Sequence, residues 1–230
     1  MKPVILLLSL AALVCGQDFT VIHERTLRRD APGSMHIDDT GITFTAERSS
    51  DSRMWAYTDI QYFDRISKQE FTILTYEDQE RYLGRDHQYH FLITEGELTD
   101  SAFERISARL GRPVTNRVVP ADIDSTLVIY AKHLHTLGGC EGQLKFTANA
   151  IYYVTDDKED AREWLLARDV QSVWSNDPYH LEIHVYDNNR REFSRTRVYK
   201  FDLKKPLDPG FYRSLKLKMY DLETTHLLIQ

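Results

Sequence analysis

A block of roughly one hundred residues occurs twice in this chain, and this repeat constrains the fold more than any other feature of the sequence. The two copies are offset by 109 residues, or by 110 after one residue is inserted in the second copy. The paired blocks are residues 33–37 with 142–146, 42–44 with 151–153, 51–55 with 160–164, 71–76 with 181–186, and 89–91 with 199–201. Similar blocks that recur in the same order indicate a duplicated structural unit.

Most of each copy has the pattern of short β-strands. Met35 and Ile37, then Ile42 and Phe44, alternate with polar residues, which is the period of half-buried strands. Residues 38–41, Asp-Asp-Thr-Gly, supply turn chemistry between them. Further strands are expected around Trp55, at residues 60–62, which continue that strand or begin another, and at 19–24, 71–75, 88–93 and 126–133.

Each copy ends in a segment with helical spacing. Phe103, Ile106 and Leu110 are three and four residues apart and form one apolar face. Thr99 or Asp100 can cap the first turn, and Gly111 ends the helix. In the second copy the expected cap is Asp208, Pro209 takes the first helical position, and the apolar face is Phe211, Leu215 and Met219.

These patterns predict a mainly β protein with capping helices, an α+β fold. Each copy is expected to form six or seven antiparallel strands followed by one C-terminal helix that covers the open end of a small barrel or sandwich. The expected boundaries are a signal peptide at residues 1–16, module 1 at 17–112, a linker at 113–125, and module 2 at 126–230. Paired aromatic residues, Trp55 with Trp164 and Tyr89 with Tyr199, are expected in the two cores.

The N-terminus has the layout of a secretory signal peptide. Lys2 precedes an apolar run from Val4 to Val14, which is shorter than the roughly 20 residues that span a bilayer. We expect cleavage after Gly16 and a periplasmic or secreted mature chain without a transmembrane segment. A lipoprotein signal that ends at Cys15 is the alternative, and Val14 disfavours it because such signals place a small residue before the cysteine.

The net charge and the number of cysteines limit which classes of partner and which covalent cross-links are expected. The formal net charge is −6, which argues against a nucleic-acid partner because such binders carry a basic footprint. Cys140 is the one cysteine after residue 16, so no intramolecular disulfide is expected in the processed chain. We consider two states for Cys140: a small buried apolar side chain, or one half of an intermolecular disulfide.

The order of motifs resembles a known superfold. A Gly-x-Leu strand, a turn, an Ile-x-Phe strand and then Ser-Arg-x-Trp-x-Tyr-x-Asp-Ile at residues 52–60 resemble the pleckstrin-homology-like fold in its GRAM-like bacterial form. The tandem arrangement is similar to exported bacterial proteins built from two such modules. The resemblance implies a seven-stranded barrel or sandwich with a C-terminal helix, and a role in docking lipid head groups, peptides or proteins.

The loops that would hold phosphates in that superfold lack the necessary charge. Phosphoinositide-binding members carry Lys and Arg between the first two strands of the Gly-x-Leu hairpin. Residues 38–41 are acidic and residues 147–149 are neutral in this chain. Neither loop offers a cationic cradle for a phosphate group, so binding of lipid head groups is not expected.

Several histidines and a glutamate lie at strand spacing in the second copy. His180, Glu182 and His184 share one face of a strand, as do His133 and His135. The first and last residues of the triplet are about 13 Å apart along a strand, too far for one ion to join them. We therefore predict no metal, cofactor or catalytic residue, and none of the common hydrolase, zinc-protease or nucleotide-binding motifs is present.

The sequence thus predicts a non-catalytic binding or scaffold protein outside the cytoplasm, with a protein or cell-envelope component as partner. The alternative is an enzyme, a hydrolase whose site lies at the seam between the modules. The ligand, the relative orientation of the modules and the oligomeric state are left open by the sequence.

Overall fold

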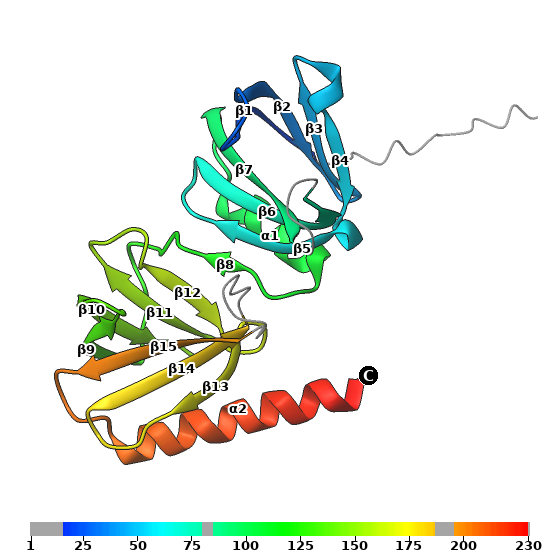
Figure 1. Ribbon diagram of the computed structural model, residues 1–230. Helices are drawn as coiled ribbons and strands as arrows, with labels where there is room; N and C mark the ends of the chain where they lie inside the picture. Colours follow the sequence, from blue (N-terminus) through cyan, green and yellow to red (C-terminus); the bar gives the residue numbers. More distant parts are fainter. Residues whose placement is uncertain (1–15, 80–84, 187–195, 230) are drawn as a thin grey trace, which may run out of the picture.

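The computed structural model describes residues 16–79, 85–186 and 196–229, with side chains to residue 222 in the final helix. The described chain is mainly β, with fifteen strands that are hydrogen-bonded in one continuous order and two α-helices (Figure 1). The mainly β class expected from the sequence is confirmed. The expected signal peptide falls almost wholly on residues 1–15, and so does Cys15; both lie outside the described residues.

The first half contains seven strands and one helix. Its neighbouring strands follow the order β5-β6-β7-β1-β2-β3-β4. Their bounds are β1 Gln17–Glu24, β2 Ala31–Ile37, β3 Gly41–Ala46, β4 Arg53–Ala56, β5 Ile60–Arg65, β6 Glu70–Asp78, β7 Asp86–Glu95 and α1 Asp100–Leu110. A 3-10 turn at Tyr57–Asp59 separates β4 from β5, so residues 60–62 begin a new strand.

The second half repeats this arrangement. Its neighbouring strands follow the order β13-β14-β15-β9-β10-β11-β12, which matches the order of the first half strand for strand. The bounds are β9 Leu127–Leu134, β10 Gly139–Phe146, β11 Ala150–Thr155, β12 Arg162–Leu165, β13 Val170–Trp174, β14 His180–Tyr186, β15 Thr196–Leu203 and α2 Pro209–Ile229. In Figure 1 the two halves lie one above the other, and α2 runs along the outer side of β13.

The buried apolar residues form two separate clusters, one in each half. One cluster runs from Phe19 to Val114 and the other from Ile129 to Met219. The Trp55 and Tyr89 ring centroids are 4.6 Å apart, and those of Trp164 and Tyr199 are 4.8 Å apart. All four side chains are buried, which confirms the prediction that they belong to the cores. Each buried large apolar side chain contributes roughly 1.5–3 kcal/mol.

The helix caps follow the expected pattern. The Thr99 hydroxyl accepts from the Ala102 N–H, and Gly111 ends α1 with a left-handed φ of 59°. Glycine adopts that conformation without the steric cost of a Cβ atom. In the second half the Asp208 carboxylate accepts from the Phe211 N–H at 2.7 Å. Ile106 and Leu215 turn into their respective cores, so each helix packs its apolar face on its own half.

The segment expected as a simple linker forms part of the sheet. Strand β8, Thr115–Asn116, pairs in parallel with β5 and antiparallel with β12. Asp64 accepts two hydrogen bonds from Arg117 just beyond it. Two strand edges with unpaired backbone groups meet here, and an extended segment between them satisfies those groups. The linker therefore joins the two halves by hydrogen bonds as well as by the chain.

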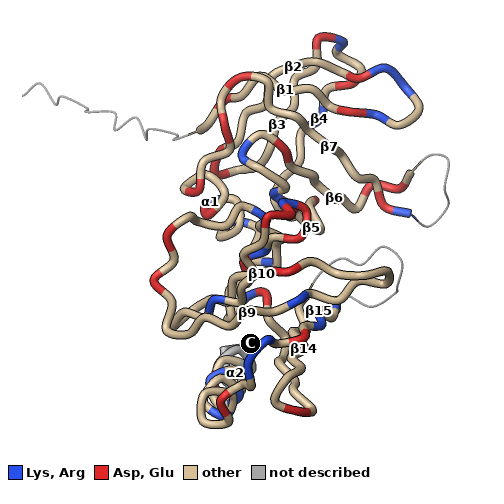
Figure 2. Tube along the Cα trace, turned by 90° about the vertical axis from the view of Figure 1, so that its left-hand side faces the viewer, with Lys and Arg blue, Asp and Glu red and all other residues tan. Residues whose placement is uncertain are grey.

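Within the described residues, neither helix is both long and apolar enough to cross a bilayer. Figure 2 shows acidic and basic residues interspersed along the chain trace of both halves in that view.

Candidate metal centre

Two histidines at the end of β9 point to the same side of the sheet. His133 lies in the strand and is buried, with 4% of its surface exposed. His135 follows it by two residues, and its side chain is 36% exposed. Residues two apart on an extended chain share a face, so the two imidazoles approach each other. His135 Nε2 is 3.0 Å from His133 Nδ1.

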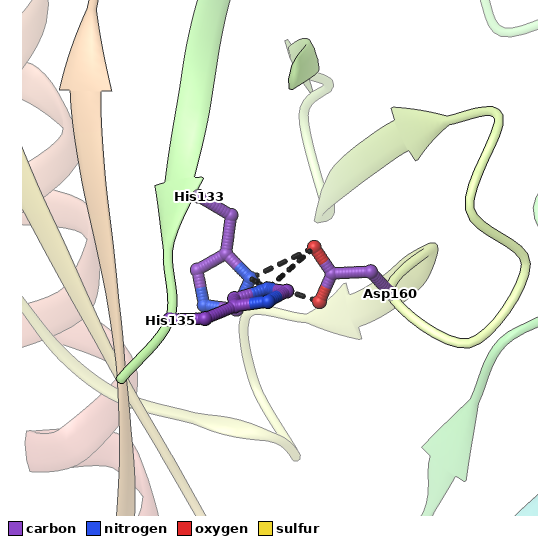
Figure 3. Close-up of side chains that lie close together, drawn as sticks. All are labelled: His133, His135 and Asp160. Atoms are coloured by element: carbon purple, nitrogen blue, oxygen red, sulfur yellow. Dashed lines mark hydrogen bonds and ion pairs between the residues drawn. The ribbon is translucent and has the colours of Figure 1, made fainter. Parts of the chain in front are cut away.

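A carboxylate from another loop completes the group. Asp160 lies in the turn between β11 and β12, where its N–H donates to the Asp157 carbonyl. Its carboxylate oxygens are 2.8 and 2.9 Å from His133 Nδ1, and Oδ2 is 3.2 Å from His135 Nε2. Figure 3 shows the two rings and the carboxylate converging on one point. Among the described residues this is the one group of three or more His, Cys, Asp or Glu side chains with metal-ligand spacing.

The distances fit a small metal ion. Zinc binds imidazole nitrogen and carboxylate oxygen at about 2.0–2.2 Å in tetrahedral geometry, which places neighbouring donor atoms about 3.3 Å apart. The contacts among the three side chains lie between 2.8 and 3.2 Å. A small outward movement of the exposed His135 ring would therefore make room for an ion between the three donor atoms.

The electrostatics of the group also suit a cation. Burial by itself would raise the pKa of Asp160, but hydrogen bonds and charge from His133 and His135 outweigh burial and hold that pKa below its ordinary value. The carboxylate is therefore ionised at neutral pH. One buried anion beside two imidazoles is a donor set that zinc and similar ions prefer.

Aromatic rings form the inner wall of the site. The His133 ring lies 5.2 Å from the Tyr199 ring and 5.0 Å from the Phe201 ring, measured between centroids. The Tyr153 hydroxyl accepts from the His133 N–H. These contacts hold His133 in place from the core side, while His135 remains open to solvent on the outer side.

Cys140 borders the group from the neighbouring strand. It is the residue directly opposite His133 in the β9–β10 ladder. Its thiol donates to Asp157 Oδ2 at 3.2 Å. Burial, followed by hydrogen bonding to Asp157 and the charges of Asp160 and Asp157, raises the pKa of this thiol to about 11. The side chain is half-buried, not fully buried, and an intermolecular disulfide stays an untested alternative.

The first half carries a different set of residues at the same positions. His23 pairs with Ala31 on one side and Phe91 on the other, as His133 pairs with Cys140 and Phe201. Two residues beyond His23 lies Arg25, whose Nη1 is 3.1 Å from Asp51 Oδ1. Asp51 matches Asp160 in the repeat. An arginine–aspartate ion pair thus occupies the place of the His135–Asp160 contact.

The charge of Arg25 makes the equivalent position in the first half unfavourable for a metal ion. Burial and the neighbouring Arg25 charge lower the pKa of His23 to about 4. The hydrogen bond from Arg25 lowers the pKa of Asp51. The guanidinium is a permanent cation without a donor lone pair, so it neutralises the carboxylate and leaves no room for an ion.

The other histidines that share a strand face are held in separate contacts. His180 contacts Asp177 and Asp202 through its two ring nitrogens, at 2.5 and 3.1 Å. His184 contacts Glu182 at 3.4 Å. Among the described residues, His180 and His184 belong to no group of three donor side chains with metal-ligand spacing.

Sequence reasoning missed the centre although both of its parts were visible. His133 and His135 were recognised as a pair on one face, and Asp160 was recognised as the partner of Asp51 in the repeat. Nothing in the spacing of either block shows that the 157–160 turn folds back over the end of β9. At the offset of 109 residues His23 aligns with Lys132, and a one-residue gap in the following hairpin loop is needed before His-x-Arg at 23–25 aligns with His-x-His at 133–135; the strand pairing shows that gap.

A cavity of about 1190 Å³ lies between the two halves, beside α1 and β13. Two of its arginines are held in ion pairs: Arg65 contacts Asp100 at 2.7 Å, and Arg168 contacts Asp169 at 2.6 Å. The described lining includes no histidine, and its one serine, Ser107, accepts from Arg168. These contacts link side chains at the junction between the two halves.

Comparisons with known proteins add little. No family model matches the sequence, and no curated protein matches it. One similar solved structure is the Spt16D–Pob3N heterodimer, with 9% identity, 82% of this chain and 95% of that chain covered, and a TM-score of 0.30. At that TM-score the likeness supports no argument about this chain.

Proposed function

We propose that this chain is a tandem of two pleckstrin-homology-like modules, module 1 at residues 17–112 and module 2 at 126–230, and that module 2 binds one divalent transition-metal ion. The tandem part rests on the matching strand orders and on the two separate apolar clusters. A C-terminal helix packed on seven strands in each half is the arrangement that the motif resemblance implies.

One observation carries the metal-binding part of the proposal. The His133 and His135 nitrogens and an Asp160 oxygen lie within hydrogen-bond distance of one another, from segments far apart in the sequence. Two imidazole nitrogens 3.0 Å apart beside one carboxylate are a donor set for zinc or a similar ion, with room for further ligands on the exposed side.

The wider role that we propose is a non-catalytic binding or scaffold function outside the cytoplasm, with a protein or cell-envelope component as partner. At the seam Arg65 and Arg168 are held in ion pairs, and the described lining offers no serine–histidine pair, which favours the binding role over a hydrolase of the serine type. The net charge of −6 disfavours a nucleic-acid partner. A bound ion near the exposed His135 side chain would fix the end of β9 at the surface that a partner meets.

Direct measurement of bound metal tests the proposal. Purified protein, kept reduced and freed of metal with a chelator, is equilibrated with Zn²⁺ by dialysis, and the bound metal is measured by mass spectrometry. We expect about one zinc per chain, and close to none for His135→Arg, which introduces the residue found at the same position of module 1. Mg²⁺ at the same concentration should not bind, because imidazole is a poor ligand for it.

A matched variant in module 1 serves as the control. Asp51→Asn changes the carboxylate equivalent to Asp160 and should leave the zinc content at one per chain. The proposal fails if wild-type protein holds no stoichiometric zinc after dialysis, or if His135→Arg holds as much zinc as wild type does.

A further inference from the structure

The position of Cys140 relative to the proposed metal ligands carries a further inference. Directly opposed residues in an antiparallel ladder project to the same face, with Cβ atoms about 5 Å apart. Cys140 is opposed to His133 in this way. Its Sγ contacts Asp157, at the start of the turn that carries Asp160. The thiol therefore lies beside the donor group, on the side where β10 meets that turn.

Comparison with module 1 supports the view that Cys140 does not lie beside the metal-ligand group by chance. At the four equivalent positions, module 1 has His23, Arg25, Ala31 and Asp51, and module 2 has His133, His135, Cys140 and Asp160. The histidine and the aspartate are common to both modules. Each of the two differences replaces a side chain that cannot bind a metal with one that can. Both gained donors lie at the same end of the β9–β10 pair, and Cys140 would have to move toward the three donor atoms of His133, His135 and Asp160 to share an ion with them.

This inference rests on the metal site proposed above. We propose that Cys140 supplies a thiolate to that ion and completes a ligand set of two nitrogens, one oxygen and one sulfur. When the metal–sulfur bond forms, the thiol proton is released to solvent, with the Asp157 carboxylate as its first acceptor. No electron is transferred, and the hydrogen bond from Sγ to Asp157 is replaced by the bond from Sγ to the ion.

This ligand set defines the class of metal. Thiolate and imidazole together favour zinc and cobalt(II) over magnesium and calcium, which take oxygen ligands. Four protein ligands also close the coordination sphere, and closed tetrahedral sites are structural, whereas catalytic zinc keeps an open position. The ion would then tie β9, β10 and the 157–160 turn together, in keeping with a non-catalytic role.

Cobalt(II) spectroscopy tests the proposal, since a thiolate bound to cobalt gives an intense near-ultraviolet charge-transfer band. Reduced metal-free protein is titrated with Co²⁺, for wild type, Cys140→Ala and His135→Arg. Cys140→Ala introduces the module 1 residue at a half-buried position, so the fold is expected to persist. We expect the band in wild type only, and at least tenfold weaker cobalt binding by Cys140→Ala.

The outcomes separate this inference from the proposed function. Cobalt binding by wild type without the charge-transfer band, or with an affinity equal to that of Cys140→Ala, overturns the thiolate proposal and leaves the metal site standing. No cobalt binding by wild type overturns both proposals. The band in wild type, its loss in Cys140→Ala and weaker binding by that variant support the thiolate ligand.

Discussion

Arg25 donates to Asp51 across the end of the first strand, with Nη1 3.1 Å from Oδ1. At the same position of the second half, His135 faces Asp160 at 3.2 Å. The strand pairing around His23 and His133 is the same, and the two residues that face the aspartates differ in chemistry: the arginine carries its own cation, while the histidine offers a lone pair. Module 1 therefore serves as a reference, within the same chain, for the candidate metal site of module 2.

The first prediction uses that comparison to remove the site without damage to the fold. His135→Arg should form an ion pair with Asp160 like that of Arg25 with Asp51. Because His135 is partly exposed and the exchange swaps one surface contact for another, we expect the free energy of unfolding to change by about 1 kcal/mol or less. Urea denaturation of metal-free protein measures this. A loss of several kcal/mol would show that the two positions are not equivalent.

The second prediction moves the site into the first half. Arg25→His places a second imidazole beside His23 and Asp51, and Ala31→Cys adds a thiol opposite His23. We expect the double variant to bind a second zinc ion, and Arg25→His alone to bind it more weakly because it lacks the sulfur ligand. Equilibrium dialysis should show the stoichiometry rising from one toward two. A stoichiometry of one in the double variant would mean that residue types alone do not determine the site.

The sequence predicts the repeat and both cores for a clear physical reason. Phe44 and Trp55 lie at positions where strand spacing turns them inward, and duplication repeats that spacing at Tyr153 and Trp164. Local periodicity reports which face of a strand is apolar, so core residues are accessible to sequence reasoning. The cap at Thr99 and the end of α1 at Gly111 can likewise be predicted from neighbouring residues in the sequence.

Features that depend on segments distant in the chain were not accessible in this way. Asp160 lies 27 residues from His133, and their contact depends on how the turn before β12 folds over β9. Residues 115–116 were expected as part of a linker because Pro113 and Pro120 flank them between the two copies. The pairing of strand β8 is determined by the two strand edges that it meets.

The third prediction concerns heat stability in the presence of metal. A ligand that binds only the folded state stabilises it by about 2.7 kcal/mol when its free concentration is 100 times its Kd. For a module of roughly one hundred residues this corresponds to a rise in melting temperature of roughly 10–20 °C. We expect zinc to raise the melting temperature of wild type and to leave that of His135→Arg unchanged. An equal rise in both proteins would indicate binding elsewhere.

The fourth prediction concerns acid stability of the first half. His23 has a pKa of about 4 in the folded protein, chiefly because of burial, and an imidazole in an unfolded chain titrates near 6.5. Below pH 6.5 the unfolded chain therefore takes up a proton that the folded chain does not. Stability is fully present above pH 6.5 and decreases as the pH falls toward 4, by up to about 3 kcal/mol.

Replacement of this histidine by an apolar side chain tests the fourth prediction. His23→Leu removes the titrating group from a position between Phe44, Tyr89 and Phe91. Urea denaturation of wild type and variant at pH 7 and pH 4.5 should show a smaller loss of stability at the lower pH in the variant. An identical loss in both proteins would assign the acid sensitivity to other groups.

The fifth prediction tests whether the two apolar clusters are independent. Phe44 is 1% exposed in β3, and truncation of a buried phenylalanine costs about 3–5 kcal/mol. Phe44→Ala should lower the stability of the first half and leave zinc binding by His133, His135 and Asp160 unchanged at temperatures where the second half is folded. Calorimetry should then show two transitions, of which zinc shifts only one. If Phe44→Ala abolishes zinc binding together with the first transition, the halves unfold as one unit and β8 couples them more strongly than two separate cores imply.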